Sequence, residues 1–179
     1  VYPDLSVFGK ALGNGFPISA VIGTGDVMSA AQSTFISSTF WTERVGFTAA
    51  IATLEKFEAL KVWEHLQSSG EKVNKAWAYA AKKTGVEIEI SGITPLTHID
   101  FVSDTPALLQ TLYTQEMLCR GYLAGSSVYS SYAYDDELLL SLPNVFEEIF
   151  TLIRDADQGD GYEKALLSEV KHSGFQRLT

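Results

Sequence analysis

Residues 3–21 read PDLSVFGKALGNGFPISAV, and this stretch decides the fold. The apolar run at residues 5–8 predicts a short buried strand, and β-branched enrichment at residues 18–23 predicts a second strand. The loop between these strands is punctuated by three glycines and carries Lys10 at the point where the first strand ends. A strand, a glycine-rich loop and a second strand are typical of a mixed α/β protein.

Lys10 lies among apolar neighbours, and it should therefore lose much of its solvation. Desolvation favours the neutral amine, which is the form that attacks a carbonyl to make a Schiff base. The neighbouring glycines leave room for a planar ring to approach the backbone. The same features also suit a lysine at a strand end whose amine reaches water.

The rest of the chain predicts a helical stretch followed by a small mixed domain. Apolar residues at helical spacing predict two helices, at about 47–57 and 62–84. Alternating residues at 86–90 predict one strand, and residues 96–101 are expected to form a second, with a third short strand at 122–124. A helix is predicted after Pro106, and a last helix opens at Asp135 and should kink or restart at Pro143. We therefore expect a domain boundary near residue 60.

Composition narrows the function classes. Hydrophobic residues make up 46% of the 179 residues, enough for a buried core, and the net charge of −9 comes without a basic run, so no nucleic-acid partner is expected. A single cysteine, Cys119, excludes an intrachain disulfide and fits a reducing, cytoplasmic location. The sequence contains no run of 18 apolar residues, so no membrane span is predicted. The three histidines share no ligand spacing, so no metal site is expected.

The run from Pro3 to Val21 closely resembles the active-site segment of the class III aminotransferases. These are fold-type I enzymes that depend on pyridoxal 5′-phosphate, and they include glutamate-1-semialdehyde aminomutase. The family motif is P-D-x-x-x-x-G-K-x-x-G-x-G-x-P, and its lysine forms a Schiff base with the cofactor. The resemblance implies that Lys10 carries the cofactor and relays protons from the substrate Cα.

A second segment, SSTFWTERVG at residues 37–46, resembles the family segment G-[ST]-T-[FYL]-x-x-N-P, which also precedes an alanine-rich helix. In the family this threonine binds the cofactor phosphate across a dimer interface. By position it is Thr39, with Ser38 beside it. Hydroxyls ahead of a helix N-terminus suit a phosphate, although a Ser/Thr-rich loop with an ordinary helix cap has the same appearance.

The second segment departs from the family where Thr42, Glu43 and Arg44 replace Gly-Asn-Pro. This departure concerns the substrate more than the cofactor. Glu43 and Arg44 line the substrate channel on one interpretation and form a solvated ion pair on the other.

The resemblance implies an α/β chain in two parts. Residues 1–60 would be the end of the large fold-type I domain that binds pyridoxal phosphate, and residues 61–179 a small α+β C-terminal domain. We expect further residues before Val1, because the family's aspartate at the pyridine nitrogen precedes the lysine strand. This segment alone should therefore be inactive.

The expected function is a homodimeric aminotransferase or aminomutase, similar to glutamate-1-semialdehyde aminomutase, acting on a small amino or keto substrate. The phosphate site would be shared across the dimer interface. The alternative is a non-catalytic dimerisation or binding relative that kept the fold.

Overall fold

The computed structural model describes residues 2–159, 166–172 and 174. The chain divides into two compact units, Val1–Val62 and Trp63–Thr179, here called unit 1 and unit 2. Each unit is described by itself.

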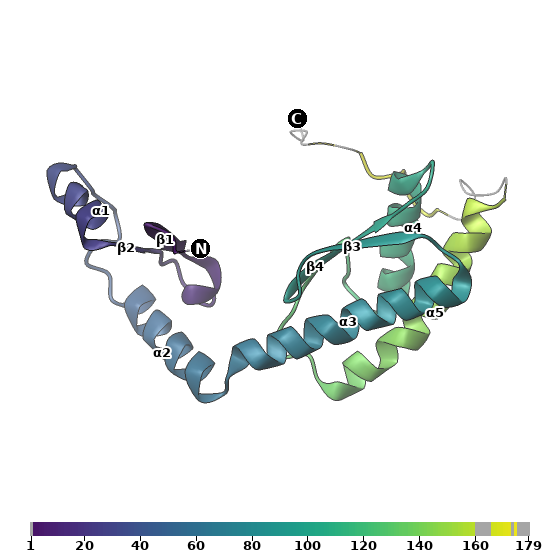
Figure 1. Cartoon of the computed structure of the whole chain (residues 1–179), viewed down its shortest axis with the longest axis horizontal. Coiled ribbons are helices and arrows are strands. Elements are labelled where there is room, and N and C mark those ends of the chain that lie inside the picture. Colours follow the sequence, from purple (N-terminus) through teal and green to yellow (C-terminus); the bar gives the residue numbers. More distant parts are fainter. Residues whose placement is uncertain (1, 160–165, 173, 175–179) are drawn as a thin grey trace. The chain divides into compact units, whose positions relative to one another are not determined.

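Unit 1 is a two-stranded sheet followed by helices (Figure 1). Strand β1 (Leu5–Phe8) pairs with β2 (Ala20–Gly23) in antiparallel register, with Phe8 opposite Ala20. The short turn η1 (Lys10–Leu12) lies between them. The remaining elements are α1 (Gly25–Ser29), η2 (Ala30–Ser33) and α2 (Val45–Ala59).

The apolar side chains of unit 1 are largely exposed. The prediction of a buried first strand was therefore wrong: the Val7 side chain is 74% exposed, and Leu5 and Phe8 are also exposed. The two-stranded sheet has no second layer within unit 1 to cover it, and a two-stranded ribbon alone buries little apolar area. Among the described residues of this unit, Ala50 is the one buried hydrophobic side chain.

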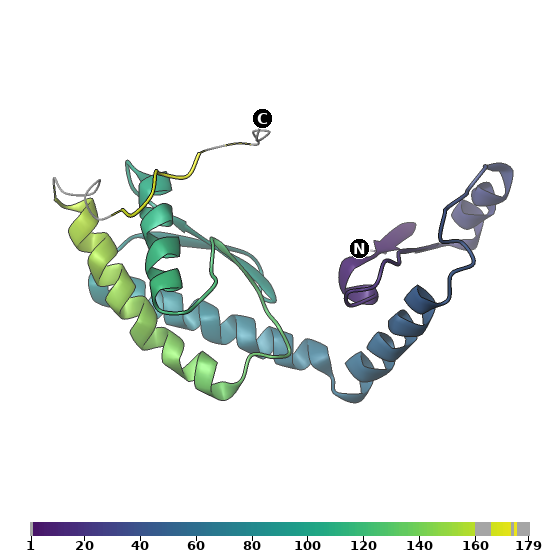
Figure 2. The same ribbon diagram turned by 180° about the vertical axis from the view of Figure 1, so that it is seen from behind.

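Unit 2 is an α+β domain with a three-stranded antiparallel sheet in the order β3-β4-β5. Its elements, in chain order, are α3 (Val62–Thr84), β3 (Ile88–Ile93), β4 (Leu96–Phe101), α4 (Pro106–Cys119), β5 (Ser127–Tyr129) and α5 (Asp136–Asp157). Both views of the ribbon show α4 and α5 side by side (Figures 1 and 2). The mixed α/β class predicted from the sequence is confirmed.

The core of unit 2 collects apolar side chains from all three helices and from β4. Its largest fully buried members are aromatic: Trp77, Tyr113, Phe146 and Phe150. The Phe150 ring lies 5.6 Å from Phe101 and 6.4 Å from Tyr113, centroid to centroid, in edge-on geometry. Such tilted aromatic packing stabilises a core beyond its area burial.

Helix α5 continues through Pro143, so the predicted restart was wrong. Buried side chains lie on both sides of the proline, at Leu142 and Phe146. The burial of this stripe outweighs the backbone hydrogen bond that the proline cannot make. The start of the helix was predicted well: the Asp135 carboxylate accepts the Leu138 amide at 2.8 Å, as a helix cap does.

The third strand differs from the prediction. The strand lies at Ser127–Tyr129 instead of 122–124. The described tail residues 166–172 are not helical, and the Leu167 amide donates to Gln115 Oε1 at 2.7 Å on α4. Cys119 is exposed. None of the helices within the described residues combines the length and hydropathy needed to cross a membrane.

An ion pair on α4 makes the stability of unit 2 depend on pH. Burial favours the neutral form of Glu116, but hydrogen bonds from Arg120, at 2.7 Å, and from Gln115 outweigh burial and lower the pKa of Glu116. The unfolded chain therefore takes up this proton first as the pH falls. The stabilisation is complete above the ordinary pKa of 4.5 and is lost as the pH falls through the lower folded-state pKa.

Glu116→Gln should lower the free energy of unfolding by about 0.5–1 kcal/mol at pH 7, because it removes a partly buried ion pair. The difference from the unsubstituted protein should shrink towards zero at a pH well below the ordinary pKa of 4.5. Urea unfolding at both pH values measures this. A difference that stays the same at both pH values would show that the effect does not come from the Glu116 charge.

Candidate functional site

The loop after β1 presents Lys10 in an uncommon backbone conformation. Its φ angle is 48°, in the left-handed region that a non-glycine residue occupies only rarely. The Lys10 carbonyl accepts the amide of Gly13 at 3.2 Å and that of Asn14 at 3.3 Å, which closes the turn. Strained positions of this kind cluster at functional sites.

Two glycines allow the Lys10 loop to fold tightly against α2. A Cβ at the buried Gly13 would collide with the carbonyl oxygen of Phe16. A Cβ at Gly46, in the first turn of α2, would lie 2.9 Å from the Pro17 carbonyl oxygen. These glycines permit the close approach, so that the end of the lysine loop rests on the start of α2.

Lys10 is exposed, and the prediction that its apolar neighbours remove it from water was wrong. The cause lies in those neighbours: Phe8 is 47% exposed, and Ala11 is also exposed. Apolar residues next to lysine in sequence desolvate it only when a second layer covers them. Unit 1 has no such layer.

Ser38 and Thr39 lie in the exposed segment before α2. The Ser38 hydroxyl accepts the Phe40 amide at 3.3 Å, a local turn contact. The structure therefore presents both hydroxyls at the surface of unit 1, where an anion has access to them.

Glu43 has a structural role that the sequence did not reveal. Its carboxylate accepts the Val45 amide at 2.8 Å and the Gly46 amide at 3.3 Å, so it caps the N-terminus of α2. Helix N-termini favour such a negative charge. In the described chain Glu43 forms no ion pair with Arg44, whose carbonyl accepts the Thr48 amide and whose side chain is exposed.

Glu43→Ala should speed hydrogen exchange at the amides of Val45 and Gly46 about fivefold, because a lost cap costs about 1 kcal/mol. Amide exchange measured by NMR or mass spectrometry tests this. Glu55→Ala, at an exposed position in the middle of the same helix, is the matched control and should leave both amides unchanged. Equal exchange in the Glu43 variant and the original protein would contradict the capping role.

A pocket of about 780 Å3, here called the Ser38 pocket, joins the end of the lysine loop to the segment before α2. Its described lining includes Ser38 and Glu43 but not Lys10, Thr39 or Arg44. Three exposed aromatic side chains complete its wall: Phe40, Trp41 and Phe47. The Trp41 side chain is 63% exposed, so it is not part of a core.

Unit 1 contains the two kinds of group that pyridoxal phosphate would need, an amine for its aldehyde and hydroxyls for its phosphate. The exposed primary amine of Lys10 suits an aldehyde, and the accessible hydroxyls of Ser38 and Thr39 suit a phosphate. Glu43 already engages the first amides of α2, so the hydroxyls, and not those amides, are the groups available to an anion. The residues present therefore fit the cofactor.

Unit 2 also contains a Ser-His-Asp arrangement that sequence spacing did not reveal. His98 Nδ1 lies 2.9 Å from Ser127 Oγ, and His98 Nε2 lies 3.1 Å from Asp100 Oδ1. The strand pairing of β4 with β5 places them together. The His98 and Asp100 side chains are 34% and 61% exposed on an open sheet face, so we assign them no catalytic role. The described residues contain no metal-binding group of three or more acidic, histidine or cysteine side chains.

Comparison of the sequence with known proteins finds aminotransferases and an aminomutase among the relatives of this chain. A family model described as "Aminotransferase class-III" matches residues 1–138. The chain is 34% identical over 116 residues to 3-aminobutyryl-CoA aminotransferase of Cloacimonas acidaminovorans. This alignment covers 64% of this chain and 28% of that enzyme. The chain is 28% identical over 171 residues to glutamate-1-semialdehyde 2,1-aminomutase of Caldivirga maquilingensis. This alignment covers 86% of this chain and 40% of that enzyme. The chain thus spans less than half the length of these curated relatives.

Solved structures share the fold. The PLP internal aldimine form of the FumI protein of Sphingopyxis sp. superposes with a TM-score of 0.78 at 25% identity, covering 92% of this chain and 40% of that chain. An omega-transaminase from Sphaerobacter thermophilus superposes with a TM-score of 0.75 at 20% identity, covering 85% and 39%. The second likeness concerns the fold alone.

Proposed function

Because this chain belongs to the class III aminotransferase family, we propose that it is part of an enzyme that moves an amino group with the help of pyridoxal phosphate. The observation that carries the proposal is the exposed amine of Lys10, held by a left-handed backbone in a glycine-closed loop. The activity belongs to the whole protein, because the chain covers less than half of its relatives.

Lys10 would hold the cofactor by bonding its amine to the aldehyde carbon of pyridoxal phosphate. When bound, pyridoxal phosphate supplies an electron sink for the carbon next to the amino group. The Lys10 amine, once released by the incoming amino group, would act as the base that takes the proton from the substrate Cα and returns it. Its open position in unit 1 gives this side chain the freedom to do both.

Ser38 and Thr39 would bind the cofactor phosphate through their hydroxyls. The Ser38 pocket contains Ser38 without Lys10, which supports a site in which the amine and the hydroxyls come from different protomers of a homodimer. A dimer with two-fold symmetry would then hold two equivalent sites. The extensive exposed apolar surface of unit 1 agrees with burial against further protein.

Arg44 would contact the substrate. Its exposed guanidinium suits a substrate carboxylate, and its side chain lies next to the segment that would bind the phosphate. Glu43 would act on the substrate only indirectly, because its carboxylate is engaged as the cap of α2.

We also propose that residues 1–60 complete the large domain of the family and that residues 61–179 are its small C-terminal domain. The separation of contacts between Val62 and Trp63 supports this assignment. The single cysteine is consistent with a cytoplasmic location, and nothing in the sequence calls for a nucleic-acid partner.

The test is an activity panel on the full-length protein loaded with pyridoxal phosphate. Transfer from amino acid donors to keto acids would identify an aminotransferase. Turnover of glutamate-1-semialdehyde alone would identify an aminomutase. A protein that binds no cofactor and turns over no donor would instead be the non-catalytic relative, and the proposal would be wrong.

A further inference from the structure

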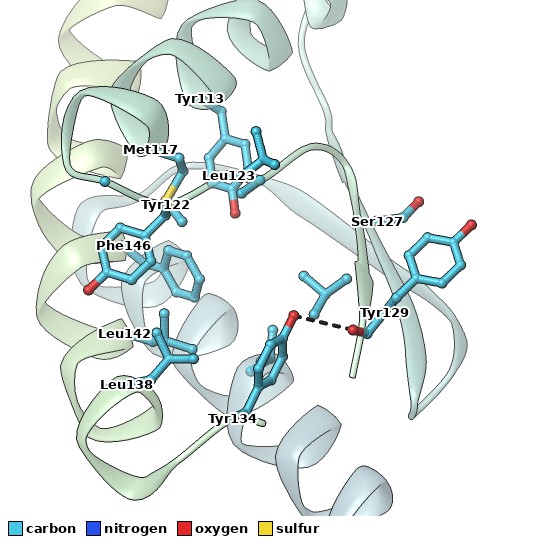
Figure 3. Close-up of a pocket in the computed structure, with 14 residues that line it drawn as sticks. Tyr113, Met117, Tyr122, Leu123, Ser127, Tyr129, Tyr134, Leu138, Leu142 and Phe146 are labelled. Atoms are coloured by element: carbon cyan, nitrogen blue, oxygen red, sulfur yellow. Dashed lines mark hydrogen bonds between the residues drawn. The ribbon is translucent and has the colours of Figure 1, made fainter. Parts of the chain in front are cut away.

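Unit 2 contains a cavity of about 380 Å3 beneath the segment that leads into β5 (Figure 3). Its main walls are Tyr113 and Met117 from α4, Leu138, Leu142 and Phe146 from α5, and Val128 from β5. This volume lies within the range of small-molecule sites. All the lining residues belong to unit 2, and none of the residues proposed to bind the cofactor is among them.

The wall of the cavity carries no charge. Every lining residue is apolar, glycine, serine or tyrosine. A carboxylate, ammonium or phosphate entering this space would lose its hydration without meeting an opposite charge. The cavity therefore does not suit an amino acid or a phosphorylated ligand, and it does suit a neutral molecule.

One polar group in the wall has an unused proton. The Tyr113 side chain is fully buried, and its oxygen accepts the Trp77 indole N–H at 3.2 Å. An indole only donates, so this bond leaves the hydroxyl proton free. Among the described residues no acceptor for that proton is found, and Figure 3 shows the hydroxyl pointing into the cavity.

The proton of Tyr113 stays on the hydroxyl. Burial raises the pKa of Tyr113, and the hydrogen bond from Trp77 only partly offsets that effect. A buried donor without a partner is rare in folded proteins and calls for an explanation. A bound acceptor would supply one.

Two other tyrosine hydroxyls of the wall already have partners, and the third further tyrosine, Tyr129, is 71% exposed. The Tyr122 hydroxyl lies 2.9 Å from Ser141 Oγ, and the Tyr134 hydroxyl donates to the Tyr129 carbonyl at 3.2 Å. Among the tyrosines of the wall, Tyr113 thus supplies the buried hydroxyl donor that is available to a ligand.

We propose that this cavity binds a small, uncharged and largely apolar molecule that accepts one hydrogen bond from the Tyr113 hydroxyl. Such a ligand would lie against Met117, Leu142 and Phe146 and would order the segment that covers it. This site is additional to the proposed amino-transfer function and does not depend on it.

The test uses two fluorinated probes with the full-length protein. 4-Fluoroanisole has an apolar ring and one ether acceptor, and 1-ethyl-4-fluorobenzene has the same ring and nearly the same size, with a CH2 group in place of the ether oxygen. Fluorine NMR titration should show saturable binding of 4-fluoroanisole, with a dissociation constant of about 0.1–10 mM for a ligand of this size. 1-Ethyl-4-fluorobenzene should bind about fivefold more weakly, because it cannot accept the hydrogen bond.

Three variants localise the binding. Tyr113→Phe should remove the difference between the two probes. Tyr122→Phe is the matched control, because it removes a hydroxyl that is already paired with Ser141, and it should preserve the difference. Ala124→Phe should abolish the binding of both probes by filling the cavity, because Ala124 lines it.

The proposal is overturned by any of three results. The first is that 4-fluoroanisole shows no saturable binding, as when another segment of the full-length protein fills the cavity. The second is that the original protein binds both probes equally. The third is that Ala124→Phe binds them unchanged. If Tyr113→Phe fails to fold, the probe comparison and the Ala124 variant still decide.

Discussion

Lys10→Ala should reduce amino transfer by the full-length protein about 10^3-fold or more, because it removes both the group that holds the cofactor and the group that moves the proton. Rates with saturating donor and acceptor measure the loss, and the visible absorbance of the bound cofactor should change with it. Added methylamine should restore part of the activity, which it would not do if the variant were merely misfolded.

The stability of the cofactor-free protein should hardly change in this variant. Lys10 is exposed, and substitutions at exposed positions usually alter the free energy of unfolding by no more than about 0.5 kcal/mol. Lys56→Ala, at an exposed position on α2, is the matched control and should retain activity. Full activity in the Lys10 variant would remove this residue from the mechanism.

Phe150→Ala should lower the free energy of unfolding of unit 2 by about 3–5 kcal/mol, the cost of removing a buried aromatic ring and leaving a cavity. The ring is fully buried and packs against Phe101, Tyr113 and Phe146. Urea or thermal unfolding followed by circular dichroism measures the loss.

Leu140→Ala on the same helix is the control for this substitution. Its side chain is 74% exposed, so the change should cost no more than about 0.5 kcal/mol. Similar losses for the two variants would mean that α5 does not bury the face that contains Phe150.

The sequence predicted unit 2 better than unit 1. Helix α3 and strands β3 and β4 show clear helical or alternating patterns, and in unit 2 each apolar face is buried against the same core. The sequence pattern is less informative where tertiary packing determines whether an element continues. Pro143 does not restart α5, because the buried stripe on both sides of it keeps the helix continuous.

In unit 1 the sequence predicted the elements but not their surroundings. β1 and β2 form as expected, whereas Val7 and Lys10 are exposed because burial depends on layers that unit 1 does not contain. Residue types alone also left the role of Glu43 open. Its capping of α2 follows from backbone geometry, since the carboxylate must reach two free amides, and no motif signals that contact.

The free hydroxyl proton of Tyr113 is another feature that the sequence alone could not predict. A tyrosine on an apolar helix face reads as core, and it is core. That its oxygen is used by Trp77 while its proton faces a cavity depends on side chains brought together from α3, α4 and α5. Contacts between residues so far apart in the chain leave no local trace in the sequence.

The central claim is that Lys10 carries pyridoxal phosphate, and borohydride reduction of the full-length protein followed by peptide mapping tests it most directly. We predict a single pyridoxyl adduct on the peptide that contains Lys10. An unmodified Lys10 in a protein without cofactor colour, or an adduct on another lysine, would contradict the claim.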